Sequence, residues 1–280
     1  MKILLIGATG LLGTSLKIFF DNQKKNSVIS YSRHTSPALD ICSVTSTKEV
    51  IGNLQPDMII NLAALTNVDQ CEESPADAFL FNSQACKNIR VAAGASCPII
   101  HISTDHFYDS PGLSDEISLN PVNYYAYSKL LGEFMLGENS LILRTNFFGK
   151  SKTTKKSFSD WIYEQLSSGN KIELFEDSFF SPLSIDALSQ IIIHCVENFI
   201  PGTYNLGSNA GISKHEFGMT FAKALELDTN LISAVKMKDK KLKAARPHDM
   251  RMDVSHFEET FKMKLPDLNQ LIQQEKNNYN

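Results

Sequence analysis

The chain has 280 residues, 42% of them hydrophobic, so it can bury the core of one large α/β domain or of a domain with a smaller lobe. The net charge of −4 excludes a general attraction to nucleic acid or anionic membranes, and no apolar run approaches the roughly 20 residues that span a bilayer. The five cysteines are scattered and the seven histidines lack ligand spacing, which predicts reduced thiols in a cytoplasmic protein and no catalytic metal.

Apolar strand-like runs alternate with helical patterns through the first half, which predicts βαβ units around a parallel sheet. We expect strands at Lys2–Ile6, Val28–Tyr31, Met58–Asn61, Pro98–Ser103 and Leu141–Arg144. The first helix carries apolar residues at Leu12, Leu16, Phe19 and Phe20. A long helix is predicted after Ser74, with this serine as its cap, a proline in the first turn and a buried stripe at Phe81, Ala85, Ile89 and Ala92.

The character of the chain changes after Arg144. Residues 151–157 are polar and lysine-rich, which suits a loop or a lobe boundary, and Ser184 is expected to cap an amphipathic helix. A strand is predicted at Thr203–Leu206, and Ser213 to Glu216 forms a capping box that opens another helix. The five lysines of residues 236–243 suit a solvated loop or, alternatively, cations that meet a phosphate.

These patterns together predict a Rossmann-type, doubly wound parallel sheet with a smaller C-terminal substrate-binding lobe. Residues 1–150 with 183–208 would form the dinucleotide-binding domain, and residues 151–182 with 209–280 would form the lobe.

A glycine-rich turn joins the first strand to the first helix. Its spacing is Gly-x-x-Gly-x-x-Gly, and its candidate cofactor residues are Gly7, Thr9, Gly10, Leu11, Leu12 and Gly13. A turn of this kind lets the backbone approach a pyrophosphate and aims helix amides at negative charge. We therefore expect a dinucleotide here.

The end of the second strand bears on the choice of dinucleotide. NAD-preferring sites place an acid there, whereas this chain has Ser32 and Arg33. Arg33 can pair with a 2′-phosphate, which favours NADP(H) and leaves NAD(H) possible; alternatively, Arg33 is merely solvated.

Tyr125 and Lys129 share one face of a predicted helix, because residues four apart are neighbours there. A cation close to the phenol would lower its pKa toward neutrality. Such a pair is common by chance, but here it accompanies the glycine turn and Thr104 at the end of a strand, where a hydroxyl can bind a substrate carbonyl. Asp105 would orient a sugar hydroxyl or cap a turn. His101 is expected in the core and His106 beside the site.

With these motifs the chain resembles the extended short-chain dehydrogenase/reductase superfamily and, within it, the dTDP-4-dehydrorhamnose reductase family. The resemblance rests on the glycine turn, Asp40-Ile41, Asn61–Asp69, Asn82, Ser103-Thr104-Asp105, Tyr125–Lys129, Gly132-Glu133, Leu143–Thr145 and Arg246-Pro247. It implies an NADP(H)-dependent reductase that transfers hydride to C4 of a nucleotide-linked 4-keto-6-deoxy sugar.

The resemblance also implies roles for single residues. Tyr125 would be the proton donor, Lys129 would hold the nicotinamide ribose, and Thr104 with Asp105 would contact the sugar. Asp40 and Ile41 would lie at the adenine, with Ala63, Ala64 and Leu65 along the middle of the cofactor. Substrate contacts would also come from His106, Phe147 and Arg246.

Three positions depart from the pattern of that family. His106 replaces an aromatic residue, Phe147 a tryptophan, and Leu65 a histidine or tyrosine, so another sugar stays open. Two other functions compete. One is an NAD-dependent sugar-nucleotide epimerase. The other is a non-catalytic NADP-binding subunit that resembles the regulatory subunit of methionine adenosyltransferase. A homodimer is also possible.

Overall fold

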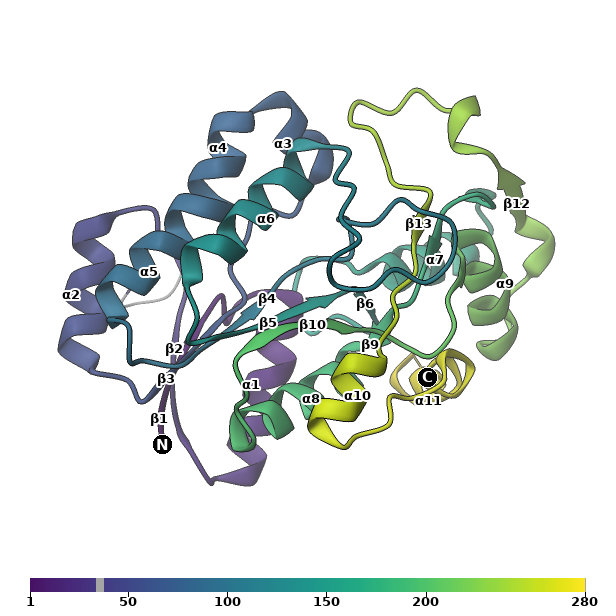
Figure 1. Ribbon diagram of the computed structural model, residues 1–280. Coiled ribbons are helices and arrows are strands. Elements are labelled where there is room, and N and C mark those ends of the chain that lie inside the picture. Colours follow the sequence, from purple (N-terminus) through teal and green to yellow (C-terminus); the bar gives the residue numbers. More distant parts are fainter. Residues whose placement is uncertain (34–37, 280) are drawn as a thin grey trace.

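A sheet of six parallel strands forms the centre of the computed structural model, which describes residues 1–33 and 38–279 (Figure 1). In sheet order the strands are β10 (Gly202–Leu206), β5 (Ser140–Thr145), β4 (Ile99–Ile102), β3 (Met58–Asn61), β1 (Lys2–Ile6) and β2 (Ser27–Tyr31). From β1 the chain adds β2 on one side and then crosses over to add β3 on the other side, so the strand order switches between β1 and β3. In open α/β sheets, ligands bind outside the carboxyl ends of the strands at this point.

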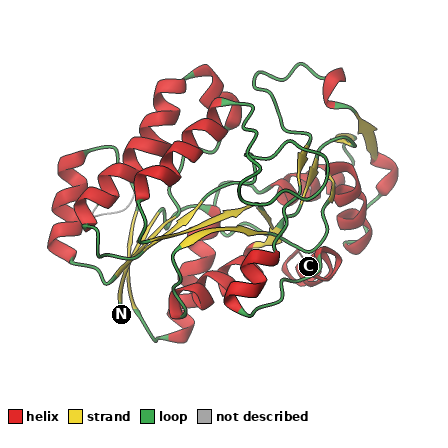
Figure 2. Cartoon of the chain, in the orientation of Figure 1, coloured by secondary structure: helices red, strands yellow, loops and turns green. Residues whose placement is uncertain are grey.

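Helices cover both faces of this sheet (Figures 1 and 2). One face carries α2 (Val44–Leu54), α5 (Ala85–Ala93) and α6 (Tyr124–Leu136), and the other carries α1 (Leu11–Gln23) and α8 (Ile185–Glu197). Alternate strand residues enter two separate apolar clusters, with Leu4 and Ile59 in one and Leu5 and Ile60 in the other. The predicted doubly wound α/β fold is confirmed.

The remaining strands form small sheets near the carboxyl edge of the central one (Figure 1). They are β6 (Phe147–Phe148) with β9 (Leu183–Ser184), β7 (Ile172–Phe175) with β12 (Ile232–Val235), and β8 (Phe179–Phe180) between β11 (Ile212–Ser213) and β13 (Asp249–Met250). The other helices are α3 (Val68–Glu73), α4 (Pro75–Phe79), α7 (Phe158–Ser167), α9 (Lys214–Ala224), α10 (Ser255–Phe261) and α11 (Leu268–Tyr279), with short 3-10 turns at Thr229–Leu231 and Met237–Asp239.

A single apolar cluster runs from the central sheet into these later elements. It contains Leu5 and Leu143 from the sheet together with Ile162 of α7 and Phe217 of α9. The two regions therefore share one core, although the exact lobe boundaries stay a prediction.

The segment after Ser74 differs from the single capped helix that was predicted. It consists of α4 (Pro75–Phe79), a π-helical turn (Leu80–Gln84) and α5. The Ser74 side chain makes no capping hydrogen bond, so that expectation is wrong. The π turn instead buries Asn82, whose Oδ1 accepts the N–H of Leu65 at 2.8 Å. π turns of this kind are frequent at functional sites.

Two other predicted helix starts are confirmed. The Ser184 side chain accepts the N–H of Ala187, and Ser213 forms a capping box with Glu216. All five cysteines are free thiols, as the scattered spacing predicted.

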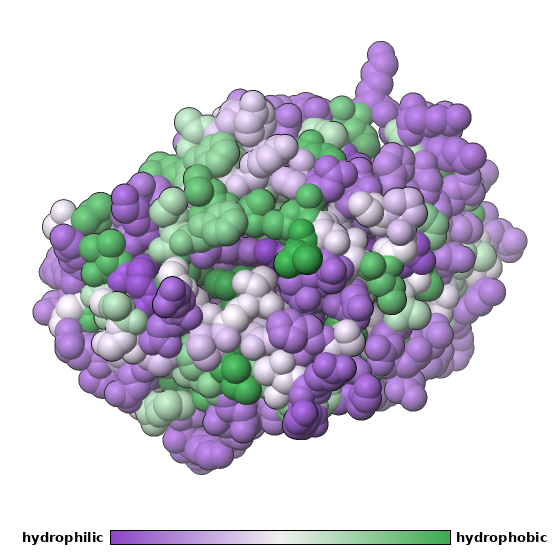
Figure 3. Space-filling model, in the orientation of Figure 1, coloured by the Kyte–Doolittle hydropathy of each residue, from purple (hydrophilic) through white to green (hydrophobic). Residues whose placement is uncertain are grey.

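Hydrophobic side chains gather on the surface over α4 and α6 (Figure 3). From α6, Tyr127, Leu131 and Phe134 are exposed at helical spacing. Among the helices of the described residues, none is long and apolar enough to cross a membrane.

Candidate active site

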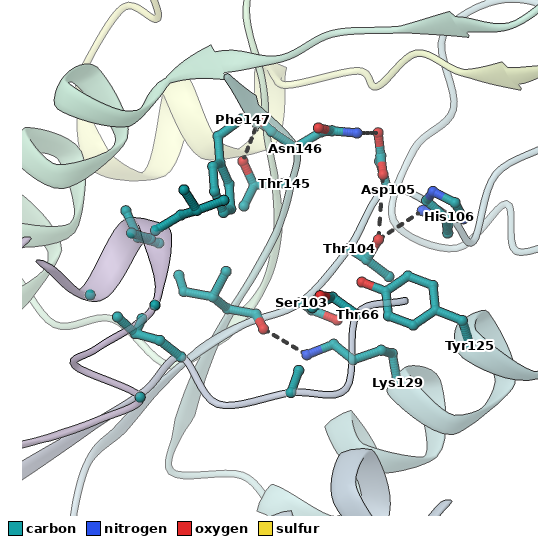
Figure 4. A pocket seen from close by; sticks show the side chains of 18 of the residues that line it. Thr66, Ser103, Thr104, Asp105, His106, Tyr125, Lys129, Thr145, Asn146 and Phe147 are labelled. Atoms are coloured by element: carbon teal, nitrogen blue, oxygen red, sulfur yellow. Dashed lines mark hydrogen bonds between the residues drawn. The ribbon is translucent and has the colours of Figure 1, made fainter. Parts of the chain in front are cut away.

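Three adjoining pockets lie along the carboxyl edge of the sheet. The central pocket has a volume of about 310 Å³ and includes Thr104, Tyr125 and Lys129 in its wall (Figure 4). The glycine-turn pocket, of about 290 Å³, shares Gly7, Gly10, Leu62, Ala64, Thr66 and Lys155 with it. The outer pocket, of about 340 Å³, shares Val68 and His106 with the central one. The structure thus brings most of the predicted site residues into one row.

The glycine turn is shaped for close contact with a ligand. Gly7 has a φ of +87°, and a Cβ there would lie 2.9 Å from the backbone N of Ala63. A Cβ at Gly13 would lie 2.3 Å from the carbonyl O of Gly7, which explains why α1 can pack so close to the turn. The N-cap of α1 is Gly10, which has no side chain to cap the first turn, and Leu11 and Leu12 line the central pocket. Free N–H groups at the start of a helix, next to glycine backbone without side chains, are suited to bind a pyrophosphate.

The end of β2 supplies a cation to the glycine-turn pocket. The Arg33 guanidinium lies 4.5 Å from the centroid of the Phe81 ring, a distance that allows a cation–π interaction. Both residues line the pocket together with Ser32 and Thr9, and no carboxylate does so among the residues that the structure describes. This wall fits a phosphate on the ribose.

Ile41, Ala63, Ala64 and Leu65 line the glycine-turn pocket, as the resemblance implied. Asp40 does not: its Oδ1 accepts the N–H of Cys42 at 3.0 Å. Only the second residue of the predicted adenine pair therefore lies in the pocket wall.

Tyr125 and Thr104 meet in the central pocket, where the tyrosine hydroxyl points toward the threonine (Figure 4). Tyr125 comes from α6 and is 8% exposed. Burial raises the pKa of the phenol, and this outweighs the opposite effect of the nearby Thr104 hydroxyl. The phenol is therefore protonated at neutral pH.

The Lys129 side chain reaches from α6 to β4. Its Nζ donates to the carbonyl O of Ile102 at 2.8 Å and lies 3.1 Å from Nε2 of His101. Burial raises the pKa of Tyr125, and Lys129 is not among the groups that lower it, so the expectation that Lys129 lowers this pKa is wrong for this structure. The two residues share a helix face, but the longer side chain reaches β4 instead. His101 is buried with partners on both ring nitrogens, as expected for a core residue.

Asp105 is fixed in the wall of the central pocket. Its Oδ2 accepts a hydrogen bond from Asn146 Nδ2 at 2.8 Å (Figure 4). Burial raises the pKa of Asp105 to about 6, although the bond from Asn146 and the charge of Lys214 act against this change. The carboxyl group thus changes its charge in the range where many enzymes are assayed.

His106 separates the central pocket from the outer pocket. Its ring meets the Tyr125 ring edge-on at a centroid distance of 5.2 Å. Burial, followed by the charges of Lys214 and Arg246, lowers the pKa of His106 to about 3, so the imidazole is neutral. Its Nδ1 is buried and has no hydrogen-bond partner among the described residues. This leaves one buried polar atom of the pocket wall unsatisfied.

The outer pocket combines two cations with aromatic rings. Lys214 Nζ lies 5.3 Å from the centroid of the Phe158 ring, and that ring stacks on Trp161 at 6.2 Å. Arg246 is held by Asp69 at 2.8 Å. Such a wall suits a planar group that carries negative charge.

Several of these residues were missed from the sequence. Lys214 lies inside a capping box and was interpreted only as part of a helix start. Asn146, Trp161 and Lys155 belong to no motif, although the Arg-Thr block that precedes Asn146 is a signal for it. Phe147 lines the central pocket as expected.

The lysine-rich segment 236–243 does not enter the pockets through its cations. Lys236, Lys240 and Lys243 pair with Glu176, Glu173 and Glu73, which favours the solvated-loop interpretation. Within the described part of the chain, no group of three or more His, Cys, Asp or Glu side chains could hold a metal ion.

The sequence matches a known protein family over nearly its whole length. Residues 1–279 match the RmlD substrate binding domain family. The chain belongs to this family. The resemblance inferred from the sequence is confirmed, because relatives in this comparison are named dTDP-4-dehydrorhamnose reductases.

Two relatives of this RmlD-family chain cover nearly its whole length. The probable low-salt glycan biosynthesis reductase Agl14 of Haloferax volcanii is 29% identical, with 92% of this chain and 91% of the relative covered. The dTDP-4-dehydrorhamnose reductase of Escherichia coli K12 is 27% identical, with 95% and 94% covered. Both names describe reductases, in agreement with the predicted enzyme class.

A solved structure and a third relative add to the comparison. The dTDP-4-dehydrorhamnose reductase of Bacillus anthracis, solved in complex with NADP, has a TM-score of 0.90 at 23% identity, with 98% of this chain and 97% of that chain covered. It supports the Rossmann-like fold. The β subunit of methionine adenosyltransferase 2 from Bos taurus is 25% identical, with 92% of this chain and 81% of the relative covered.

Proposed function

We propose that this protein is an NADP(H)-dependent reductase that transfers a hydride to C4 of a nucleotide-linked 4-keto-6-deoxy sugar. The observation that carries the proposal is the position of Tyr125. Its hydroxyl lies in the central pocket, between a glycine-turn pocket suited to a dinucleotide and an outer pocket suited to a nucleotide. A proton donor at this junction can reach a substrate carbonyl that lies next to the cofactor.

The cofactor would follow the row of pockets from Arg33 to Lys129. The pyrophosphate would meet the first amides of α1 at Leu11 and Leu12, and the adenine would lie against Ile41. Arg33 would pair with the 2′-phosphate and so favour NADPH over NADH. Lys155 lines both the central pocket and the glycine-turn pocket, so it is placed to add positive charge near the middle of the cofactor.

Residues of the chain would supply the proton. The bound dinucleotide would supply the hydride, and Tyr125 would give its proton to the former carbonyl oxygen. Burial raises the pKa of Tyr125, so the donor is a protonated phenol before the reaction. Thr104 would hold the substrate oxygen beside the tyrosine through its hydroxyl. Lys129 would hold the nicotinamide ribose.

The substrate would fill the outer pocket and reach into the central one. Lys214 and Arg246 offer positive charge for a diphosphate, and Phe158 with Trp161 offers an aromatic surface for a base. Asp105, His106 and Phe147 would then surround the sugar. In this proposal residues 151–182 with 209–280 act as the substrate-binding lobe.

Two alternatives make different predictions. The similarity to the methionine adenosyltransferase β subunit supports a non-catalytic NADP-binding role, in which the chain would bind cofactor without turnover. An NAD-dependent epimerase is less well supported, because Arg33 stands where an acid would bind the ribose. A homodimer and a cytoplasmic location stay predictions.

The test is NADPH oxidation, followed by absorbance, with a panel of 4-keto-6-deoxy sugar nucleotides. We expect turnover with at least one sugar, and Tyr125→Phe should lower kcat by about 10²- to 10⁴-fold while cofactor affinity is kept. Tyr127→Phe is the matched control, since Tyr127 lies on the same helix but is 49% exposed. Flat absorbance with every sugar, alongside tight NADPH binding, would support the binding subunit instead.

A further inference from the structure

A chain of buried hydrogen bonds connects the cofactor side of the sheet to Lys129. It runs from the backbone N–H of Ala63 through Asn61 of β3 and His101 of β4 to the lysine Nζ. The side chains of Asn61, His101 and Lys129 are all at most 2% exposed. Each donor and acceptor in the chain must therefore be satisfied within the protein.

The direction of every hydrogen bond follows from the first one. The Ala63 N–H can only donate, so the amide atom of Asn61 that lies 3.2 Å away is its oxygen, Oδ1. The amide nitrogen Nδ2 consequently faces Nδ1 of His101 at 3.0 Å and donates to it. Nδ1 is then the acceptor of the imidazole, and the ring proton lies on Nε2.

This proton meets Lys129. His101 Nε2 lies 3.1 Å from the lysine Nζ, and the Nε2–H requires an acceptor there. An ammonium has three donors and no acceptor, whereas a neutral amine has one lone pair. The amine can accept from His101 and still donate to the carbonyl O of Ile102 at 2.8 Å. The hydrogen-bond pattern is complete only with an uncharged lysine.

We propose that Asn61 and His101 are positioning residues that hold Lys129 as a neutral amine in the cofactor-free protein. Protonation of Lys129 would require His101 to move its proton to Nδ1 and the Asn61 amide to rotate. The rotated amide would present Nδ2 to the Ala63 N–H, so one hydrogen bond would be lost. Ionisation of Lys129 is thereby coupled to the backbone of Ala63, which lines the glycine-turn pocket.

The surroundings of Lys129 agree with this arrangement. Burial lowers the pKa of Lys129, and the two groups that act in the opposite direction are Cys86 and Glu133. Burial raises the pKa of Cys86 to about 11, so at neutral pH it is a thiol without charge. Glu133 is already paired with Arg144 at 2.7 Å and accepts a hydrogen bond from Ser103. Tyr125, the remaining titratable neighbour on α6, is a neutral phenol.

The inference deepens the proposed function, in which Lys129 is a cofactor residue, but it is tested on the cofactor-free protein. We call the hydrogen-bond chain from the Ala63 N–H through Asn61 and His101 to Lys129 the relay. A failure of the relay and a failure of the reductase activity can therefore be told apart. The first measurement is the tautomer of His101, read from the ¹⁵N shifts of its ring nitrogens in the unmodified protein. We expect the proton on Nε2. A proton on Nδ1, or on both nitrogens, would overturn the proposal without any substitution.

The second measurement is an NMR titration of lysines labelled with ¹³C at Cε, in which Lys129→Met identifies the signal of Lys129. We expect this signal to titrate at a lower pH than those of exposed lysines, because burial disfavours the charged form. Asn61→Leu frees the histidine tautomer without adding charge, and His101→Gln offers an oxygen to the ammonium. Each should raise the midpoint by about 1 pH unit, a tenfold change in the ionisation constant.

The matched control is Asn88→Leu. Asn88 is another buried amide, which donates to the carbonyl O of Ile41 and not to the relay, so its loss should leave the Lys129 midpoint unchanged. If Lys129 titrates with the exposed lysines, it is not held as an amine. If its midpoint is low but neither Asn61→Leu nor His101→Gln moves it, burial alone is the cause and the relay is refuted.

Discussion

Gly13 lies where α1 packs against the turn that precedes it, and its replacement tests the cofactor site directly. In Gly13→Ala the new Cβ would meet the Gly7 carbonyl O at 2.3 Å and the Ala8 Cα at 2.8 Å. Both are backbone atoms that cannot rotate away. Restoring ordinary contact requires α1 to move by about 1 Å, because carbon contacts are optimal near 3.5–4.0 Å.

Two opposing effects set the magnitude. Overpacking at a site that cannot relax costs up to about 3 kcal/mol, and alanine in place of glycine within a helix returns about 1 kcal/mol. We therefore expect the free energy of unfolding to fall by about 2 kcal/mol. Gly52→Ala is the control: Gly52 lies in α2 with no atom within 4 Å of its added Cβ, so this variant should gain about 1 kcal/mol.

Urea unfolding followed by circular dichroism gives both free energies, and fluorescence titration gives the NADPH affinity. The two variants should differ by about 3 kcal/mol, and Gly13→Ala should bind NADPH at least about tenfold more weakly, because the helix amides move away from the pyrophosphate. If Gly13→Ala were as stable as Gly52→Ala, the close approach of α1 would not be what this glycine provides.

Three further outcomes are expected. Arg33→Asp should shift the ratio of NADPH to NADH affinity toward NADH by about 10- to 100-fold, and an unchanged ratio would place the 2′-phosphate elsewhere. Asp105, with its pKa raised to about 6, is protonated below that pH; substrate KM should therefore rise as the pH falls through 6, and Asp105→Asn should abolish that dependence. Lys155→Ala should weaken cofactor binding several-fold in a salt-dependent way, whereas Lys156→Ala, whose lysine pairs with Glu164, should not; equal effects would remove Lys155 from the site.

The central fold could be predicted because its signals are local. The first strand is apolar after Lys2 and the third is apolar up to Asn61, and the capping box at Ser213 consists of side chains only three residues apart. The π turn at residues 80–84 has no comparable signal, since it arises where Asn82 reaches Leu65 and Ser128 in other parts of the chain. Tertiary contacts decide such a turn.

Sequence motifs predicted the positions of individual site residues but not the contacts between them. The positions of Tyr125 and Thr104 follow from their elements, but the protonation of the tyrosine does not. Helix geometry places Tyr125 and Lys129 on one face, whereas the direction of the lysine depends on His101 and Ile102 of β4. Lys214 was missed for a similar reason, because its burial depends on rings of α7 and β8 that lie far away in the sequence.

The apolar cluster shared by the sheet and the later elements limits how this protein can diversify. Segments of the two regions alternate along the chain and pack into the same interior, as Leu143 and Phe217 show. A chimera made by one crossover with a relative would therefore leave mismatched surfaces throughout its interior. New sugar preferences are reached more readily through single replacements in the pocket walls. His106 and Phe147 are two positions at which such replacements can be tested.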